Sequence, residues 1–144
     1  MRKFLLSFLL LVTGCAYSQK YVLIDKKMSQ PLSYTNKVTL EHSYKGFFAV
    51  ESAMIHQFIA AVEKIAAQLS GKAPRPDAFN FNVGKTNFMG QKVHLAKEET
   101  MNVVLTTDCD GTKIMMHLSE AKMSNANNAF FVNTWLKYIK GALK

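Results

Sequence analysis

The chain begins with a short basic end and an apolar run that has neither the alternation of a strand nor the periodicity of a helix. Arg2 and Lys3 precede the nine-residue run Phe4–Val12, and small residues follow it. This order of basic, apolar and small residues is typical of a secretory signal peptide, and the run is too short to span a bilayer. We therefore expect an exported protein with a leader over residues 1–18 and a single domain over residues 20–144.

Two cleavage sites compete at the end of this leader. Val12-Thr13-Gly14-Cys15 resembles a bacterial lipobox, which makes Cys15 a lipidation candidate and shortens the leader to residues 1–14. Ala16-Tyr17-Ser18 resembles an ordinary site with small residues around the cut. We expect a periplasmic or secreted protein, attached to a membrane only if Cys15 carries a lipid. A chain processed at either site can form no internal disulfide, because Cys109 is its other cysteine.

Short segments of alternating polarity predict the strands of the mature chain. They cover residues 20–25, 37–42 and 79–83 and the beginning of a strand at Val93 and Leu95. The apolar segment 46–50 is either a further strand or the entry to a helix.

The best-defined feature is a hairpin that joins residues 100–109 to residues 112–120. Its turn, Asp110-Gly111, suits a two-residue connection with positive φ at both positions. Counting outward from the turn pairs Val103, Leu105 and Thr107 with Leu118, Met116 and Ile114 on one face, and Val104, Thr106 and Asp108 with His117, Met115 and Lys113 on the other. The first face is apolar, so turn and hydrophobic pattern predict the same register.

Two segments repeat apolar residues at spacings of three and four, the period of an amphipathic helix. Residues 51–70 form the first and place Gln68 on the polar side. Residues 128–143 form the second, with Trp135 on its apolar face and Phe130 on the flank of that face. The order of elements predicts an α+β domain: an antiparallel sheet of about six strands with the two amphipathic helices packed on one face.

Lysine gives the chain a positive balance that survives loss of the leader. The sequence has 18 Lys and Arg against 10 Asp and Glu, and removal of Arg2 and Lys3 leaves sixteen against ten, a net charge near +6. Scattered lysines are typical of a solvated surface, and their functional interpretation is attraction to an anionic partner. Nucleic acid is not expected, because Arg75 is the one arginine outside the leader and export removes the usual target.

Signatures of catalysis and cofactor binding are missing from the sequence. It contains no G-x-G-x-x-G, Walker, G-x-S-x-G or H-E-x-x-H pattern, and no two of its four histidines lie within five residues of each other. We therefore expect no catalytic residue, no metal site and no cofactor. His94 and His117 are expected on exposed strand faces.

A loop predicted over residues 84–90 supplies the candidate binding residues. Lys85, Phe88 and Met89 lie in it, and bulky apolar side chains exposed in a loop indicate a partner. The alternative is that Phe88 folds back onto the sheet.

These features favour a non-catalytic binding or assembly module of the cell envelope or the secreted fraction. Its expected partner is another envelope protein or an anionic surface. Two alternatives stay open: a carrier of a small hydrophobic ligand in a cavity between the long helix and the sheet, and a secreted inhibitor or immunity-type protein.

Overall fold

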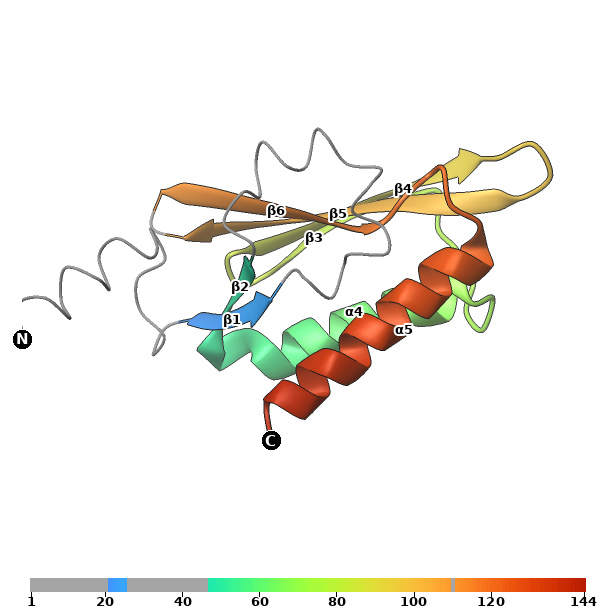
Figure 1. Ribbon diagram of the computed structural model, residues 1–144. Helices are drawn as coiled ribbons and strands as arrows, with labels where there is room; N and C mark the ends of the chain where they lie inside the picture. Colours follow the sequence, from blue (N-terminus) through green and yellow to red (C-terminus); the bar gives the residue numbers. More distant parts are fainter. Residues whose placement is uncertain (1–20, 26–46, 110) are drawn as a thin grey trace, which may run out of the picture.

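Six strands and two α-helices form the described part of the chain (Figure 1). This structure is a computed structural model in which the described residues are 21–25, 47–109 and 111–144. The leader, Cys15 and the strand expected over residues 37–42 lie outside these ranges. Those predictions therefore stay predictions.

The elements follow one another as a strand pair, a helix, four strands and a helix. Their bounds are β1 Tyr21–Asp25, β2 Phe47–Glu51, the 3₁₀ turn η2 Ser52–Met54, α4 Ile55–Leu69, β3 Ala78–Val83, β4 Thr86–His94, β5 Glu99–Cys109, β6 Thr112–Ser119 and α5 Asn125–Ala142. The α+β class is confirmed.

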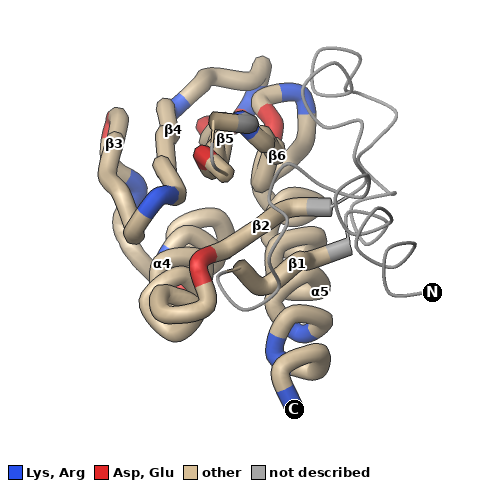
Figure 2. The backbone as a smooth tube through the Cα atoms, turned by 90° about the vertical axis from the view of Figure 1, so that its left-hand side faces the viewer, with Lys and Arg blue, Asp and Glu red and all other residues tan. Residues whose placement is uncertain are grey.

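The strands form two antiparallel sheets, so the expectation of one sheet was wrong. β1 pairs with β2, and β3, β4, β5 and β6 form a four-stranded sheet in that order. Figures 1 and 2 show the two helices and the β1–β2 sheet on the same side of the four-stranded sheet. The physical reason is that β2 runs through η2 directly into α4, which brings this strand into the helix layer.

The predicted β5–β6 register is confirmed from Val104 to Asp108. Leu105 faces Met116, and Gly111 has φ +91° at the turn, as a two-residue connection requires. The pairing predicted for Val103 was wrong, because a bulge between residues 103 and 104 moves its partner to Ser119. A bulge inserts one extra residue into a strand without turning the apolar face outward.

Phe58 of α4 stands at the centre of the core. Its ring lies 6.2 Å from Phe48 of β2, 5.5 Å from Phe88 of β4 and 5.9 Å from Trp135 of α5, measured between ring centroids. Each of these side chains has 0 % exposure. Phe81 stacks on Phe88 at 5.0 Å and extends the cluster to β3. The aromatic cluster thus joins the sheet, the strand pair and both helices.

Asn128 ties the beginning of α5 to the sheet. This side chain is fully buried, and its Nδ2 donates to Thr100 Oγ1 at 3.2 Å and to the Glu120 carbonyl at 2.9 Å. Its Oδ1 accepts from the backbone N–H of Glu120 at 3.1 Å. Ser124 precedes the helix as its N-cap, and its hydroxyl accepts from the Asn127 N–H.

Cys109 lies at the end of β5, fully buried and disulfide-bonded. The chain has one other cysteine, Cys15, which lies outside the described residues. We expect no internal disulfide in the processed chain, whereas Cys109 is disulfide-bonded in this structure of residues 1–144.

Phe58→Ala should destabilise the protein strongly, because it removes a fully buried ring that contacts three other aromatic side chains. We expect the free energy of unfolding to fall by about 3–5 kcal/mol in urea titrations. Phe130→Ala is the matched control: this ring is 71 % exposed, and its loss should change the same quantity by about 0.5 kcal/mol or less. Equal losses in the two variants would contradict the central position of Phe58.

Candidate binding surface on the helix layer

The residues predicted to form a binding loop belong mostly to a strand. The loop prediction for residues 84–90 was wrong, since β4 begins at Thr86 and the turn consists of Gly84 and Lys85. Successive strand residues point to opposite faces, so Phe88 is fully buried whereas Met89 is 52 % exposed. The alternative that Phe88 folds back onto the sheet is the one the structure shows.

The structure does not gather Lys85, Phe88 and Met89 into one site. Lys85 lies at the β3–β4 turn, where its Nζ donates to the Tyr21 hydroxyl at 3.2 Å and stands 5.8 Å from the centre of that ring. These contacts attach the turn to β1. A binding role for Lys85 and Met89 stays a prediction.

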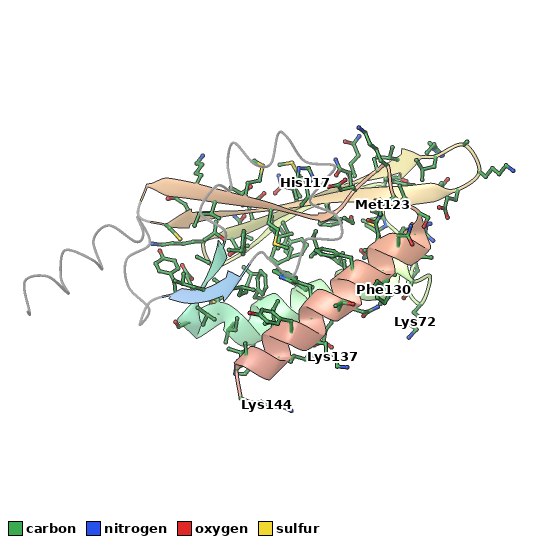
Figure 3. The ribbon with its side chains drawn as sticks, viewed as in Figure 1. Lys72, His117, Met123, Phe130, Lys137 and Lys144 are labelled. Atoms are coloured by element: carbon green, nitrogen blue, oxygen red, sulfur yellow. The ribbon has the colours of Figure 1, made fainter. Side chains whose placement is uncertain are left out.

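A groove of about 380 Å³ runs between the two helices. Its lining is Glu63, Ala66, Ala67, Ser70, Lys72, Asn133, Leu136, Lys137 and Lys140. Small alanine side chains on α4 leave the space, and long polar side chains form its walls. In Figure 3, Lys137 extends from α5 on the side away from the sheet, Lys144 lies just beyond the end of α5, and Lys72 lies just beyond the end of α4.

The charges along this groove are unbalanced. Lys140 Nζ lies 3.3 Å from Glu63 Oε1, and this ion pair joins the two helices. Lys72 and Lys137 are exposed, and neither forms an ion pair with another described residue. Glu63 is the one acidic residue within α4 and α5. The groove therefore carries positive charge that is not neutralised by the helices themselves.

One exposed stripe of α5 combines these lysines with an aromatic ring. Its members are all exposed and follow one another at alternating spacings of three and four, and the last of them lies two residues beyond the end of α5: Phe130, Asn133, Lys137, Lys140 and Lys144. Such spacing places residues on one helix face. Phe130 is 71 % exposed, which corrects its expected position beside the apolar face. The spacing of the three lysines was the sequence signal that could have found this surface.

Acidic residues gather instead at one end of the four-stranded sheet. Lys92 Nζ lies 3.2 Å from Asp77 and 3.4 Å from Glu99, and its hydrogen bonds to these two carboxylates raise its pKa. Glu98 accepts from the backbone N–H and the side-chain amide of Asn125, both at 3.3 Å. The described carboxylates at this end thus already have partners.

The two strand histidines differ in exposure. His94 has a side-chain exposure of 79 %, as expected, and its Nδ1 lies 3.7 Å from Glu99. His117 was also expected to be exposed, but it is partly buried, and its Nδ1 has no hydrogen-bond partner among the described residues. Burial lowers the pKa of His117, and the negative charge of Glu120 opposes this effect.

Within the described ranges, no group of three or more His, Cys, Asp or Glu side chains is arranged to hold a metal ion. Neither of the described helices combines the length and the apolar character needed to cross a membrane. Comparisons with protein-family models, curated proteins and solved structures found no match for the chain.

Acidification should destabilise the protein through His117. Because its pKa is lowered in the folded state, the unfolded chain takes up the proton first, and the free energy of unfolding falls as the pH drops below about 6.5. His117→Gln should lose less stability than the wild type between pH 7 and pH 5 in urea titrations. A wild-type pH dependence of the free energy of unfolding in His117→Gln would refute the assignment.

Proposed function

We propose that the protein is an exported, non-catalytic binding module of the cell envelope that attaches to an anionic lipid surface through its helix layer. The observation that carries the proposal is the α5 stripe from Phe130 to Lys144, together with Lys72 across the groove. Its lysines outnumber the single carboxylate of the two helices, which is already paired with Lys140.

The chemistry of this face suits a bilayer surface. A lysine close to an anionic membrane contributes about 1 kcal/mol, and its aliphatic stem can lie along apolar material while the ammonium stays in water. Phe130 supplies an exposed ring next to these charges, and such a ring is stabilised at the boundary between headgroups and acyl chains. Several weak contributions on one rigid face give reversible binding that added salt weakens.

The leader supports the same proposal. A lipid on Cys15 excludes this residue from a disulfide with Cys109 and would leave only residues 16–20 before β1 begins at Tyr21. Five extended residues reach about 18 Å at most, so such a tether would hold the domain beside the membrane. A short tether raises the effective concentration of a weakly binding face.

A carrier of a small hydrophobic ligand has less support. The pocket between α4 and β3 has a volume of about 230 Å³, and pockets for small molecules usually begin at about 300 Å³. The aromatic side chains between the helices and the centre of the sheet are fully buried against one another.

Vesicle binding should depend on the lysines of the helix layer. We expect the purified protein to sediment with phosphatidylglycerol-containing vesicles at low salt and to stay in solution with pure phosphatidylcholine vesicles. The triple variant Lys72→Gln, Lys137→Gln, Lys144→Gln should bind roughly 100-fold more weakly, because it removes three charges worth about 1 kcal/mol each.

The matched control changes the net charge by the same amount elsewhere. Lys97, Lys113 and Lys122 are exposed and lie outside the helices, and their replacement by Gln should reduce binding by only about threefold or less. Equal losses in the two triple variants would refute a helix-layer site. Equal binding to both kinds of vesicle would refute an anionic lipid partner.

Processing of the leader is tested by the intact mass of the protein from a bacterial envelope preparation. Export predicts either a chain that begins at acylated Cys15 or one that begins at Gln19, and a single spectrum separates the two. A chain that begins at Met1, with the disulfide of Cys109 intact, would contradict the signal-peptide interpretation.

A further inference from the structure

β3 forms one edge of the four-stranded sheet. Among the described strands it pairs only with β4, and Figure 2 shows it at the outer end of the row. Residues 78–83 contain no lysine, proline or bulge, the features with which edge strands commonly prevent further pairing. As far as the described residues extend, the edge is therefore open to another strand.

The alternation of hydrogen-bonded and non-hydrogen-bonded pairs in the β3–β4 hairpin decides which backbone groups of β3 face this edge. Val83 and Thr86 flank the two-residue turn and form a hydrogen-bonded pair, as do Asp77 and Lys92 at the other end, where the Lys92 N–H donates to the Asp77 carbonyl at 2.8 Å. Residues at alternate positions from these, which are Ala78, Asn80 and Asn82, direct their N–H and C=O groups outward. Three outward-facing residues can hydrogen bond to an added strand.

An apolar pocket lies directly beside this edge. It has a volume of about 230 Å³ and is lined by Lys64, Ile65, Gln68, Pro76, Phe79 and Phe81. Gly90 helps to form it, because a Cβ there would overlap the Phe79 ring, which instead lies against the β4 backbone. The rings of Phe79 and Phe81 are 5.6 Å apart and form the wall of the pocket on the β3 side.

Gln68 brings an unused hydrogen-bond acceptor to the pocket. This residue is 7 % exposed, and its Oε1 is buried with no partner among the described residues. Its burial corrects the expectation that it lies on the polar side of the helix. A buried carbonyl oxygen without a donor is costly, so it indicates a group that arrives from outside with an N–H or O–H.

We propose that β3 and this pocket bind an extended peptide segment of a partner protein, added antiparallel to β3 with a tyrosine in the pocket. In such an addition, the side chains at non-hydrogen-bonded positions project toward the helix layer and meet Phe79 and Phe81. Tyrosine combines an aromatic body that contacts these two rings with a hydroxyl that can donate to Gln68 Oε1. Lys64 at the rim favours an acidic residue two positions from the tyrosine.

A second copy of the chain fits this edge less well. Pairing of β3 with its own copy about a two-fold axis would bring Lys64 of both copies toward the same interface, where their positive charges repel each other. It would also offer phenylalanine rings, which have no donor for Gln68 Oε1. The site is separate from the basic α5 stripe, so this inference does not depend on the proposed lipid binding.

The probe for this site is the terminally blocked peptide Thr-Val-Thr-Tyr-Thr-Glu-Thr, titrated into the isotopically labelled protein. We expect saturable changes in the amide NMR signals of residues 78–83. Two further peptides separate the backbone hydrogen bonds from the hydrogen bond of the tyrosine hydroxyl. N-methylation of the two threonines that flank the tyrosine should abolish binding, and replacement of the tyrosine by phenylalanine should weaken binding roughly three- to tenfold.

Two pairs of variants test the site from the protein side. Asn80→Pro removes one outward N–H and should weaken binding at least about tenfold, whereas Asn80→Ala loses the same side-chain bond to Asn87 but retains the N–H and should change binding by less than about threefold. Gln68→Leu should weaken binding of the tyrosine peptide roughly three- to tenfold and leave binding of the phenylalanine peptide unchanged. If Asn80→Pro fails to fold, the N-methylated peptide gives the same test on the wild-type protein.

Three outcomes would overturn the proposal. They are no binding of the tyrosine peptide at millimolar concentration, equal affinity of the Asn80→Pro and Asn80→Ala variants, and sedimentation of the protein alone as a dimer that Asn80→Pro dissociates. The last result would assign the edge to a second copy. The two proposals fail separately: vesicle binding without peptide binding would overturn only the strand addition, and peptide binding without vesicle binding would overturn only the proposed lipid binding.

Discussion

The contact of Phe58 with three other aromatic rings is the interaction on which the rest of the structure depends. The four-stranded sheet has one apolar face, and a single side chain of α4 contacts its β4 strand, the β1–β2 pair and α5. Burial of this side chain sets the rotation of α4 about its axis. With Phe58 inward, the helix period turns Glu63 toward α5 and places Gln68 beside β3. Core packing thus positions both candidate binding surfaces.

Local pattern was sufficient to predict the elements but not all of their partners. The Asp110-Gly111 turn and the alternation around it predicted the β5–β6 register from Val104 onward, because both signals lie within a few residues. The pairing of β1 with β2 has no such local signal, since these strands are distant in sequence. Gly84 and Gly90 both resembled loop residues, yet Gly90 lies in β4, where it makes room for the Phe79 ring. This reason is a tertiary contact, which the residues around Gly90 in the sequence do not indicate.

The candidate sites divide in the same way. The lysine spacing along α5 is a local pattern, so the basic stripe was open to prediction from the sequence. The burial of Gln68 was not, because it depends on the segment after α4. Arg75 Nε donates to the Gln68 carbonyl at 3.0 Å, and its Nη1 donates to the Glu99 carbonyl at 2.6 Å. These bonds hold the segment against the end of α4 and bring Pro76 over the pocket.

The two surfaces lie on different parts of the molecule, and this separation has a mechanical consequence. The basic stripe belongs to the helix layer, whereas β3 lies at the edge of the sheet above it (Figure 2). In a module attached to an anionic surface by α5, the β3 edge would stay accessible to a partner. The reason is that an added strand extends the sheet laterally and does not have to pass through the helix layer. The helices and the four-stranded sheet lie in two layers of one domain (Figure 1), so attachment through α5 would present the sheet edge to a partner in a defined direction.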